Sequence, residues 1–275
     1  MLIYGKEIRE KIKQNLIKEA ADIKLTLVIL QIGEDPSSAS YIRGILKFAG
    51  ETGIMARVIN FPESITEDEL LMLINDLNTD PDITGIMLQT PLPSHLNTSR
   101  IINHIDYRKD VEGIHNYNLG KLLSREEGVK PATPKAVVRM LKEFNIPLEG
   151  KKITIIGRSL VVGSPLAVML TSENATVTLC HSRTANLPGE VQNADIVVAA
   201  LGKMNFVTPE MINSNSVIID VGTNFDEYGN MVGDVDPAAK DKAYLASAVP
   251  GGVGAITVAE LFDNLLTLYK QTANK

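Results

Sequence analysis

Short apolar runs alternate along this chain with longer segments of helical periodicity. Near-continuous apolarity over about five residues indicates a strand that is buried on both faces, as in a parallel sheet. Such runs occur at Leu25–Ile32, Ile83–Leu88, Lys152–Ile156, Thr176–Leu179, Ile196–Ala200 and Val217–Val221. Helical patterns lie between and after them, at Ser37–Glu51, Thr66–Asn78, Pro134–Phe144, Pro165–Glu173, Pro209–Ile212 and Val258–Lys270. This order predicts an α/β protein with mainly parallel sheets.

Two of the predicted helices begin with capping signals. Thr66 and Glu69 have the spacing of a capping box, in which each side chain accepts from the backbone N–H of the other residue. Thr133-Pro134 puts a proline at the expected first helical position, where its missing N–H costs no hydrogen bond. Both signals support the starts of these helices.

The periodicity breaks between Tyr117 and Pro131, where glycines and charged residues replace the apolar pattern. Such a stretch is typical of a domain boundary. We therefore expect an α/β first domain over residues 1–116 and a Rossmann-type second domain over residues 132–257. The terminal segment, residues 258–275, is a candidate to pack back on the first domain.

Composition and charge exclude several classes of protein. The 275 residues are 44% hydrophobic and 22% charged, as in ordinary globular proteins. A formal net charge of -6 without a Lys/Arg cluster gives no footprint for nucleic acid. Cys180 is the single cysteine, so no intrachain disulfide can form, and a reducing compartment fits. Early charged residues argue against a secretory signal, and the apolar runs are too short to span a bilayer, so we expect a cytoplasmic protein without a membrane partner.

A turn with two glycines joins the strand at Lys152–Ile156 to the following helix. Gly157 permits a tight bend, and Gly163 permits close packing of the helix on the strand. Because a helix start presents free N–H groups to an anion, Gly157, Arg158, Ser159 and Gly163 are candidates to bind a cofactor phosphate. Ser159 stands where the dinucleotide fingerprint has its second glycine, and the last glycine comes one residue late. An ordinary strand-to-helix turn is therefore the alternative.

The end of the next strand indicates which dinucleotide fits. An NAD site normally has Asp or Glu there to bind the ribose hydroxyls. Here the strand is followed by His181-Ser182-Arg183-Thr184, without an acid. Ser182, Arg183 and Arg158 can donate to a 2′-phosphate, which a carboxylate would repel. The pattern predicts NADP, and the alternative is a pair of solvated arginines on loops.

Two later loops follow predicted strands at the same expected edge of the sheet. They contain Gly222-Thr223 and Pro250-Gly251-Gly252. Ligands of open α/β sheets bind outside the carboxyl ends of the strands, so we expect both loops to line the nicotinamide side. Alone, each would be an ordinary turn.

The first domain has polar residues at expected strand and helix ends. Tyr41 lies on the helix after the first strand, Gln89 follows the second strand, and Asp110 and Glu112 come shortly before the boundary. Such groups suit a small polar ligand. Taken singly, Tyr41 is more often a packing residue, and the two acids are more often surface charges.

The order and spacing of these motifs resemble the bifunctional methylenetetrahydrofolate dehydrogenase/methenyltetrahydrofolate cyclohydrolase family over nearly the whole chain. The segments that carry the resemblance are Gly33-Glu34-Asp35-Pro36 through Tyr41, Gln89-Thr90-Pro91-Leu92-Pro93, Lys109-Asp110-Val111-Glu112-Gly113, Pro131-Ala132-Thr133-Pro134, Gly157-Arg158-Ser159 with Val162-Gly163, Asp220-Val221-Gly222 and Pro250-Gly251-Gly252-Val253-Gly254.

The resemblance implies a homodimer that holds tetrahydrofolate derivatives in a cleft between its two domains. It further implies hydride transfer from the methylene bridge to NADP, followed by hydrolysis of the methenyl product to formyltetrahydrofolate. Tyr41 and Gln89 match the family's substrate-site tyrosine and glutamine. Glu112 stands where the family usually has a second aspartate, expected to bind the pterin ring. We assign Tyr41, Gln89, Asp110 and Glu112 to the catalytic site, with Pro250, Gly251 and Gly252 as further substrate contacts.

One position departs from the family pattern. The family has a lysine four residues after the tyrosine, and this chain has Ile45. At 100° per residue, Arg43 and Lys47 do not share the Tyr41 face of the helix. Hydride transfer depends mainly on positioning, whereas hydrolysis needs a proton carrier. The sequence predicts robust dehydrogenase activity with weak or differently catalysed cyclohydrolase activity.

Three alternatives remain open at this point. The chain could be a dehydrogenase-only folate enzyme, a Rossmann dehydrogenase of another small substrate, or a non-catalytic nucleotide-binding protein. The histidines lack the spacing of metal ligands, so no metal site is expected.

Overall fold

The computed structural model describes residues 1–33 and 36–273. Its chain divides into two compact units. The six-stranded unit comprises Met1–Glu10 and Pro131–Thr257, and the three-stranded unit comprises Lys11–Lys130 and Val258–Lys275. Glu34 and Asp35, which belong to the first family-like segment, and residues 274–275 lie outside the described residues.

The six-stranded unit is built on one parallel sheet. Its strands follow the order β1 (Leu2–Ile3), β11 (Leu245–Ser247), β8 (Val217–Asp220), β7 (Ile196–Ala199), β5 (Lys152–Ile156) and β6 (Thr176–Cys180). Counted along the chain from β5, this is a 2-1-3-4-5 order, a doubly wound arrangement that differs from the classical dinucleotide-binding order 3-2-1-4-5-6. The direction of winding reverses between β5 and β7, which makes the carboxyl ends of these two strands the expected place for a ligand.

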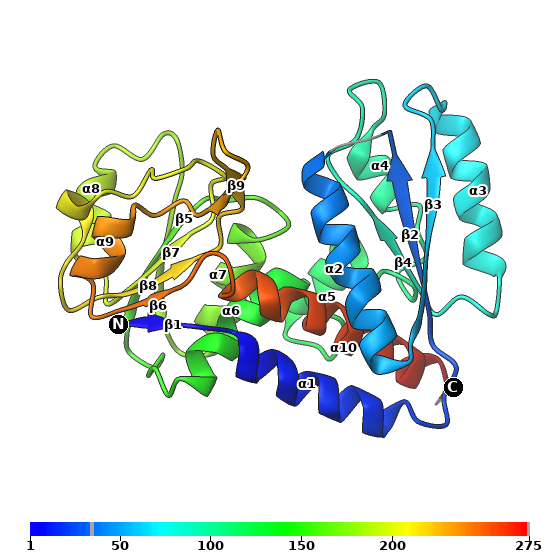
Figure 1. The fold of residues 1–275 in the computed structure, drawn as a ribbon, viewed down its shortest axis with the longest axis horizontal. Coiled ribbons are helices and arrows are strands. Elements are labelled where there is room, and N and C mark those ends of the chain that lie inside the picture. The colour runs from blue at the N-terminus through cyan, green and yellow to red at the C-terminus, as the bar shows by residue number, and fades with distance from the viewer. Residues whose placement is uncertain (34–35, 274–275) are drawn as a thin grey trace. The chain divides into compact units, whose positions relative to one another are not determined.

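Helices cover both faces of this sheet (Figure 1). One face carries α6 (Ala132–Glu143) and α7 (Gly163–Ser172), and the other carries α8 (Leu187–Gln192), the 3-10 helix η1 (Pro209–Met211) and α9 (Pro237–Lys242). On the second face Val197 and Ile218 of the sheet pack with Val191, Ile212 and Ala239. A small antiparallel hairpin of β9 (Asn224–Phe225) and β10 (Met231–Val232) completes the unit.

Two details of the predicted helices in this unit were wrong. The helix expected from Pro134 begins at Ala132, with Pro131 as the N-cap, so Pro134 lies inside the first turn. The helix expected at Pro209–Ile212 is a single 3-10 turn, because it is too short to establish a ladder of α-helical hydrogen bonds.

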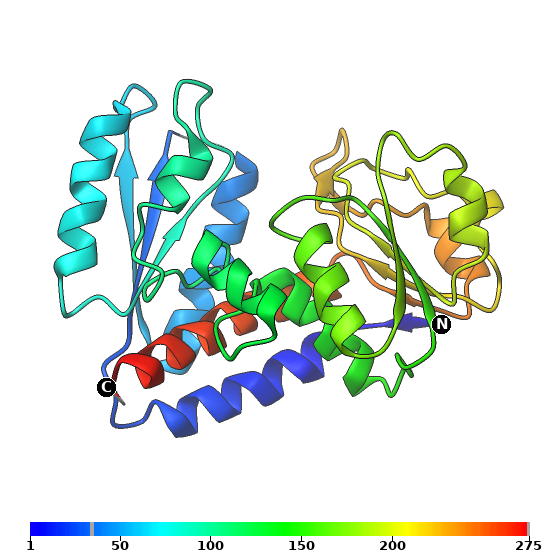
Figure 2. The same cartoon turned by 180° about the vertical axis from the view of Figure 1, so that it is seen from behind.

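The three-stranded unit has a parallel sheet in the order β3 (Met55–Phe61), β2 (Thr26–Ile32) and β4 (Gly85–Leu88). Figures 1 and 2, from opposite sides, place α2 (Pro36–Thr52) on one face and α3 (Glu67–Thr79) with α4 (Thr98–Ile102) on the other. Val28, Leu30 and Leu88 point toward α3 and α4, where they form one core with Leu70 and Ile101. The unit also contains α5 (Asn116–Ser124), within the segment where the sequence pattern predicted a boundary.

The two chain ends belong to different units. Leu2 and Ile3 pair with Ala246 and Ser247, so the first ten residues belong to the six-stranded unit, although the expected first domain, residues 1–116, includes them. They contribute a strand that is too short to give an apolar run. Helix α1 (Lys6–Glu19) and helix α10 (Val253–Ala273) both contain a unit boundary.

Within the three-stranded unit, the later part of α10 is tied to the chain that precedes it. Asn264 Nδ2 donates to the carbonyls of Val111 (3.0 Å) and Lys130 (2.9 Å). The rings of Phe48 and Phe262 lie 5.1 Å apart between centroids, and both side chains are fully buried. These contacts explain why a segment so distant in sequence shares the core of this unit.

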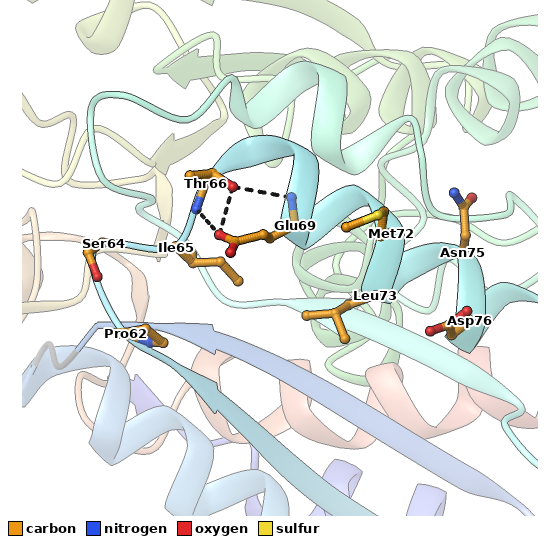
Figure 3. A pocket seen from close by; sticks show the side chains of 9 residues that line it. All are labelled: Pro62, Ser64, Ile65, Thr66, Glu69, Met72, Leu73, Asn75 and Asp76. Atoms are coloured by element: carbon orange, nitrogen blue, oxygen red, sulfur yellow. Dashed lines mark hydrogen bonds between the residues drawn. The ribbon is translucent and has the colours of Figure 1, made fainter.

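The capping box predicted at Thr66 is confirmed. Glu69 N donates to Thr66 Oγ1 at 3.3 Å, and Thr66 N donates to the Glu69 carboxylate at 2.9 Å. Figure 3 shows these bonds at the start of α3, beside a surface pocket of about 950 Å³ whose lining residues all come from the segment Pro62–Asp76. No residue predicted for the site lines this pocket.

Candidate active site

Gln89 follows β4 directly and continues the sheet by one hydrogen bond. Its N–H donates to the carbonyl of Leu30 on β2 at 2.9 Å. Its side-chain Nε2 donates to the carbonyl of Thr90 at 2.8 Å, and the peptide bond from Thr90 to Pro91 is cis. The strand end and this local bond together fix where the Gln89 side chain leaves the sheet.

Asp110 organises the loop that follows beside β4. It is only 4% exposed and forms an isolated parallel bridge with Ile86. Its carboxylate accepts from the backbone N–H of Gly113 (3.0 Å), that of His115 (2.8 Å) and Asn118 Nδ2 (2.8 Å). Burial raises the pKa of Asp110, while these donors act in the opposite direction. Because donors of the chain itself surround this carboxylate, Asp110 holds the loop of the site in place.

Glu112, two residues further on, has a much sparser environment. Within residues 1–33 and 36–273, its Oε2 accepts a hydrogen bond from the backbone N–H of Leu88 at 3.3 Å. Burial and the negative charge of Asp110 raise the pKa of Glu112 to about 8. A carboxyl group with this pKa carries its proton at neutral pH, and such groups are concentrated at functional sites.

Tyr41 on α2 lies close enough to Glu112 for the charge of that carboxylate to act on the Tyr41 hydroxyl. Burial raises the pKa of the Tyr41 hydroxyl, and the carboxylate of Glu112 raises it further. The three-stranded unit therefore brings Tyr41, Glu112 and Asp110 together at the end of β4, where Gln89 also lies. These residues come from three separate segments of the chain.

Ile45 lies one helical turn after Tyr41 on α2 and is fully buried. Arg43 and Lys47 on the same helix are both exposed. The helix therefore presents an apolar side chain inward at the position where the family resemblance implies lysine, and its own cations, Arg43 and Lys47, are exposed.

The turn after β5 is closely packed. Gly157 has φ +120°, and a Cβ at this residue would overlap the carbonyl oxygen of Ala200, which follows β7. A Cβ on Gly163 would overlap the carbonyl oxygen of Gly157 itself. The turn thus brings together the ends of β5 and β7, the two strands at which the winding reverses, and only glycine fits at these two positions.

Helix α7 begins directly after this turn, and no side chain caps it. Its N-cap residue, Val162, makes no capping hydrogen bond, while Ser159 Oγ accepts from the Val162 N–H at 3.1 Å. Ser164 Oγ donates back to the carbonyl of Arg158 at 3.0 Å. An uncapped helix start behind a turn of fixed shape is suited to an anion such as a pyrophosphate.

The residues predicted to bind a 2′-phosphate lie at one edge of the sheet. Ile156 pairs with Cys180 in register, so Arg158 and Ser182 each stand two residues beyond paired strand residues. Arg158, Ser182 and Arg183 are exposed, and the Arg183 N–H donates to Nδ1 of His181 at 3.0 Å. Strand β6 ends at Cys180, and His181 and Ser182 stand between it and Arg183.

The loops with Gly222-Thr223 and with Pro250, Gly251 and Gly252 follow β8 and β11 in the same unit. Gly222 is buried, Thr223 is exposed, and the bond from Val249 to Pro250 is cis. The Gly251 carbonyl accepts from the Gly5 N–H at 2.8 Å, and a Cβ on Gly252 would overlap the Ala248 carbonyl. Both loops are therefore held closely by the backbone around them.

Sequence reasoning missed two buried groups that stabilise the loops after β7 and β8. Asp234 accepts from the backbone N–H groups of Leu201 (2.7 Å), Gly202 (3.0 Å) and Lys203 (2.8 Å), and from Asn224 Nδ2 (2.9 Å). Lys240 pairs with the buried Asp220 at 2.7 Å. An acid directly after glycine at Gly233-Asp234 was the available signal, but nothing local indicates that its partners lie about thirty residues earlier.

Two family models match this chain. The catalytic-domain model of tetrahydrofolate dehydrogenase/cyclohydrolase matches residues 3–112, and the NAD(P)-binding-domain model of the same family matches residues 131–273. The chain belongs to the tetrahydrofolate dehydrogenase/cyclohydrolase family. The predicted family and two-domain α/β class are thus confirmed, and the matched segments contain the two groups of site residues described above.

Known members of the family are similar over nearly the full length. Bifunctional protein FolD 2 of Syntrophomonas wolfei is 61% identical over 268 residues, covering 98% of both chains. The bifunctional methylenetetrahydrofolate dehydrogenase/cyclohydrolase FolD of Campylobacter jejuni superposes with a TM-score of 0.94 at 38% identity, covering 99% of both chains. The Trypanosoma brucei enzyme, solved with NADP and an inhibitor, also gives 0.94, at 31% identity, over 100% of this chain and 99% of that one.

Among residues 1–33 and 36–273, no group of three or more His, Cys, Asp or Glu side chains is arranged to hold a metal ion. No helix in that part of the chain combines the length and apolarity needed to cross a membrane.

Proposed function

We propose that this protein oxidises methylenetetrahydrofolate to methenyltetrahydrofolate, with NADP as the hydride acceptor. The observation that carries the proposal is that the chain has the family's two domains together with Tyr41, Gln89 and an acidic group at one strand end. Family membership also favours a folate substrate over the hydroxy or amino acid of the alternative Rossmann dehydrogenase.

NADP fits the six-stranded unit at the turn after β5. The cradle of Gly157 and Gly163 leaves no room for a side chain, and the positive end of the α7 dipole would face the pyrophosphate. Arg158, Ser182 and Arg183 would hold the 2′-phosphate, while the loops at Gly222-Thr223 would lie toward the nicotinamide. When bound, the nicotinamide supplies the hydride-accepting carbon.

The folate would be held by Tyr41, Gln89 and Glu112 of the three-stranded unit. Substrate contacts of Pro250, Gly251 and Gly252 remain a prediction from the family resemblance. Tyr41 keeps its proton at all physiological pH values because its pKa is raised, so its hydroxyl acts as a hydrogen-bond donor. Asp110 does not touch the ligand in this proposal, since its carboxylate holds Gly113, His115 and Asn118. Its role is to position Glu112.

The cyclohydrolase step is proposed to be weak. Water attack on the methenyl bridge needs a group that moves protons, which typically contributes about 10²–10⁴-fold to the rate. Ile45 cannot carry a proton and is fully buried, while the cations Arg43 and Lys47 point to solvent. Hydride transfer requires orientation of two bound molecules and is not expected to suffer from this replacement.

The decisive experiment is an assay with methylenetetrahydrofolate and either NADP or NAD that follows the formation and the disappearance of the methenyl product. We expect reduction of NADP, with slow loss of the methenyl absorbance afterwards. Arg158→Ala should raise the KM for NADP tenfold or more with little change for NAD, since one charge-assisted phosphate contact contributes roughly 1.5–3 kcal/mol.

Lys151→Ala is the matched control, because it removes a cation at the amino end of β5, away from the carboxyl edge. It should leave both KM values unchanged. Equal effects of Arg158→Ala on the two cofactors would remove the phosphate role assigned to Arg158. Absence of any folate-dependent reduction of NADP or NAD would overturn the dehydrogenase proposal and favour a non-catalytic nucleotide-binding protein.

A homodimer and a cytoplasmic location remain predictions from the family resemblance and the composition. Sedimentation of the purified protein tests the first, since a single chain has a mass of 29.9 kDa and a dimer twice that.

A further inference from the structure

Asp110 and Glu112 form a pair of neighbouring carboxyl groups with unequal support. Asp110 has three donors within 3.0 Å, two from the backbone and one from Asn118. Among the described residues, Glu112 accepts from the Leu88 N–H at the longer distance of 3.3 Å. Burial raises the pKa of both carboxyl groups, and hydrogen-bond donors favour the ionised form, so the proton that the pair holds more firmly lies on Glu112, which has fewer donors.

The other charged groups around Glu112 do not change this assignment. On α2, Tyr41 adds only a neutral hydroxyl, and Arg43 and Lys47 are exposed. Lys109 is turned away, because its ammonium donates to the carbonyls of Leu77 (2.8 Å) and Asp80 (2.6 Å). His115 meets Asp110 through its backbone N–H, while its ring caps α5 by accepting from the Tyr117 N–H at 2.9 Å.

A pterin ring has one edge with two hydrogen-bond donors, the 2-amino group and the neighbouring ring N–H. This edge pairs with an ionised carboxylate, which can accept both hydrogen bonds. A protonated acid offers one donor and one acceptor, and here its accepting oxygen, Oε2, already receives the Leu88 N–H. When Glu112 loses its proton, it has a free lone pair for each of the two pterin donors, so the complex favours the ionised form.

We propose that this protein binds the pterin ring with the ionised form of Glu112, so that each folate molecule that binds displaces one proton from the Asp110–Glu112 pair. The proposal rests on the proposed function and adds a proton to its binding equilibrium. Ionising a group whose pKa is about 8 costs roughly tenfold in affinity at pH 7, that is about 1.4 kcal/mol. Two charge-assisted hydrogen bonds contribute roughly tenfold or more each, so the ionised complex is favoured.

The test is calorimetric titration of the full protein with tetrahydrofolate at pH 7 in phosphate and in Tris, two buffers with different enthalpies of ionisation. We expect the apparent binding enthalpies to differ by the amount that corresponds to about 0.9 proton released per site, falling toward about 0.1 at pH 9. The Kd should correspondingly tighten about tenfold between pH 7 and pH 9.

Glu112→Gln should bind at least tenfold more weakly at pH 9, release no proton, and lose the pH dependence of its Kd. His115→Asn is the matched control: asparagine can cap α5 as histidine does, so proton release should persist. Equal enthalpies in the two buffers for the wild type, or proton release by Glu112→Gln, would overturn the inference while folate binding itself stands. If tetrahydrofolate does not bind at all, the proposed function fails together with it.

Discussion

Lys240 on α9 places its ammonium 2.7 Å from the carboxylate of Asp220 at the end of β8, and the two side chains are 10% and 0% exposed. Asp220 also accepts from the backbone N–H groups of Gly222 (3.0 Å), Asp234 (2.9 Å) and Val235 (3.2 Å). The ion pair therefore joins α9 to the end of β8, where Asp220 also holds the Gly222-Thr223 loop beside the expected nicotinamide site and the segment Asp234-Val235. Loss of the Lys240 ammonium would leave the charge of Asp220 buried in the six-stranded unit without its counterion.

Lys240→Met should destabilise the protein by about 3 kcal/mol, the lower end of the range for loss of one partner of a buried pair, since three N–H donors to Asp220 remain. Thermal unfolding measures the effect. The control is Lys142→Met, which removes an exposed pair with Glu173 at 2.6 Å, and should change stability by about 1 kcal/mol or less. Similar losses for the two variants would show that burial of the Asp220 pair is energetically unimportant.

Gly163→Ala should disrupt the phosphate-binding turn. A methyl group there meets the carbonyl oxygen of Gly157, so the backbone must move, at a cost of roughly 1–3 kcal/mol. The KM for NADP is expected to rise at least tenfold in the same assay. Gly120→Ala is the control, because this helical residue has open space around its Cα, and alanine should stabilise α5 by about 0.5–1 kcal/mol. An unchanged KM for the Gly163 variant would contradict the assigned cradle.

The sequence predicted those elements whose signals are local. Strands β5, β7 and β8 are buried over most or all of their length and were recognised as apolar runs, and the run at Thr176–Leu179 also predicted the less buried edge strand β6. Strand β3 was missed because it lies at a sheet edge and carries exposed polar residues, Arg57 and Asn60 among them, and so shows no continuous apolar run. Strand β1 is recognisable only through its pairing with β11.

The candidate site also combines features that have a local sequence signal with features that depend on packing. Arg158 and Ser182 follow strand ends that a pattern can identify, and their common edge follows from parallel pairing. The protonation of Glu112 depends on how many donors Asp110 attracts from other segments. That balance is a property of packing, so the sequence could indicate an acidic segment without indicating which acid is ionised.

Ile45→Lys tests whether the missing lysine limits the cyclohydrolase reaction. A lysine at this fully buried position would have a lowered pKa, which suits proton transfer near neutral pH, but it should also destabilise the fold by several kcal/mol. At a temperature where the variant stays folded, we expect methenyltetrahydrofolate hydrolysis to rise at least tenfold relative to dehydrogenase turnover. Ile45→Met, an apolar change of similar size, should leave that ratio unchanged. A wild-type protein that hydrolyses the methenyl product as fast as it forms it would refute the proposed limitation.

The raised pKa of Glu112 also predicts how stability depends on pH. Its folded-state pKa of about 8 lies above the ordinary value of 4.5, so the folded protein holds a proton that the unfolded chain releases between these values. The associated stability is fully present below about pH 4.5 and is lost as the pH rises through 8. Without ligand, the wild type should lose about 2–4 kcal/mol relative to Glu112→Gln between pH 5 and pH 9, since each unit is worth about 1.4 kcal/mol and partial exposure reduces the total.

The matched control for this pH dependence is Glu69→Gln in the capping box of α3. The hydroxyl and backbone N–H of Thr66 lower the pKa of Glu69, so its contribution is lost only as the pH falls below the ordinary range of a glutamate. Chemical denaturation at a series of pH values should therefore give a constant difference between the wild type and Glu69→Gln from pH 6 to pH 9. Over the same range the difference between the wild type and Glu112→Gln should change steadily. A constant difference for both variants would mean that Glu112 is already ionised at neutral pH. Its burial and its nearness to Asp110 would then not keep the carboxyl group protonated.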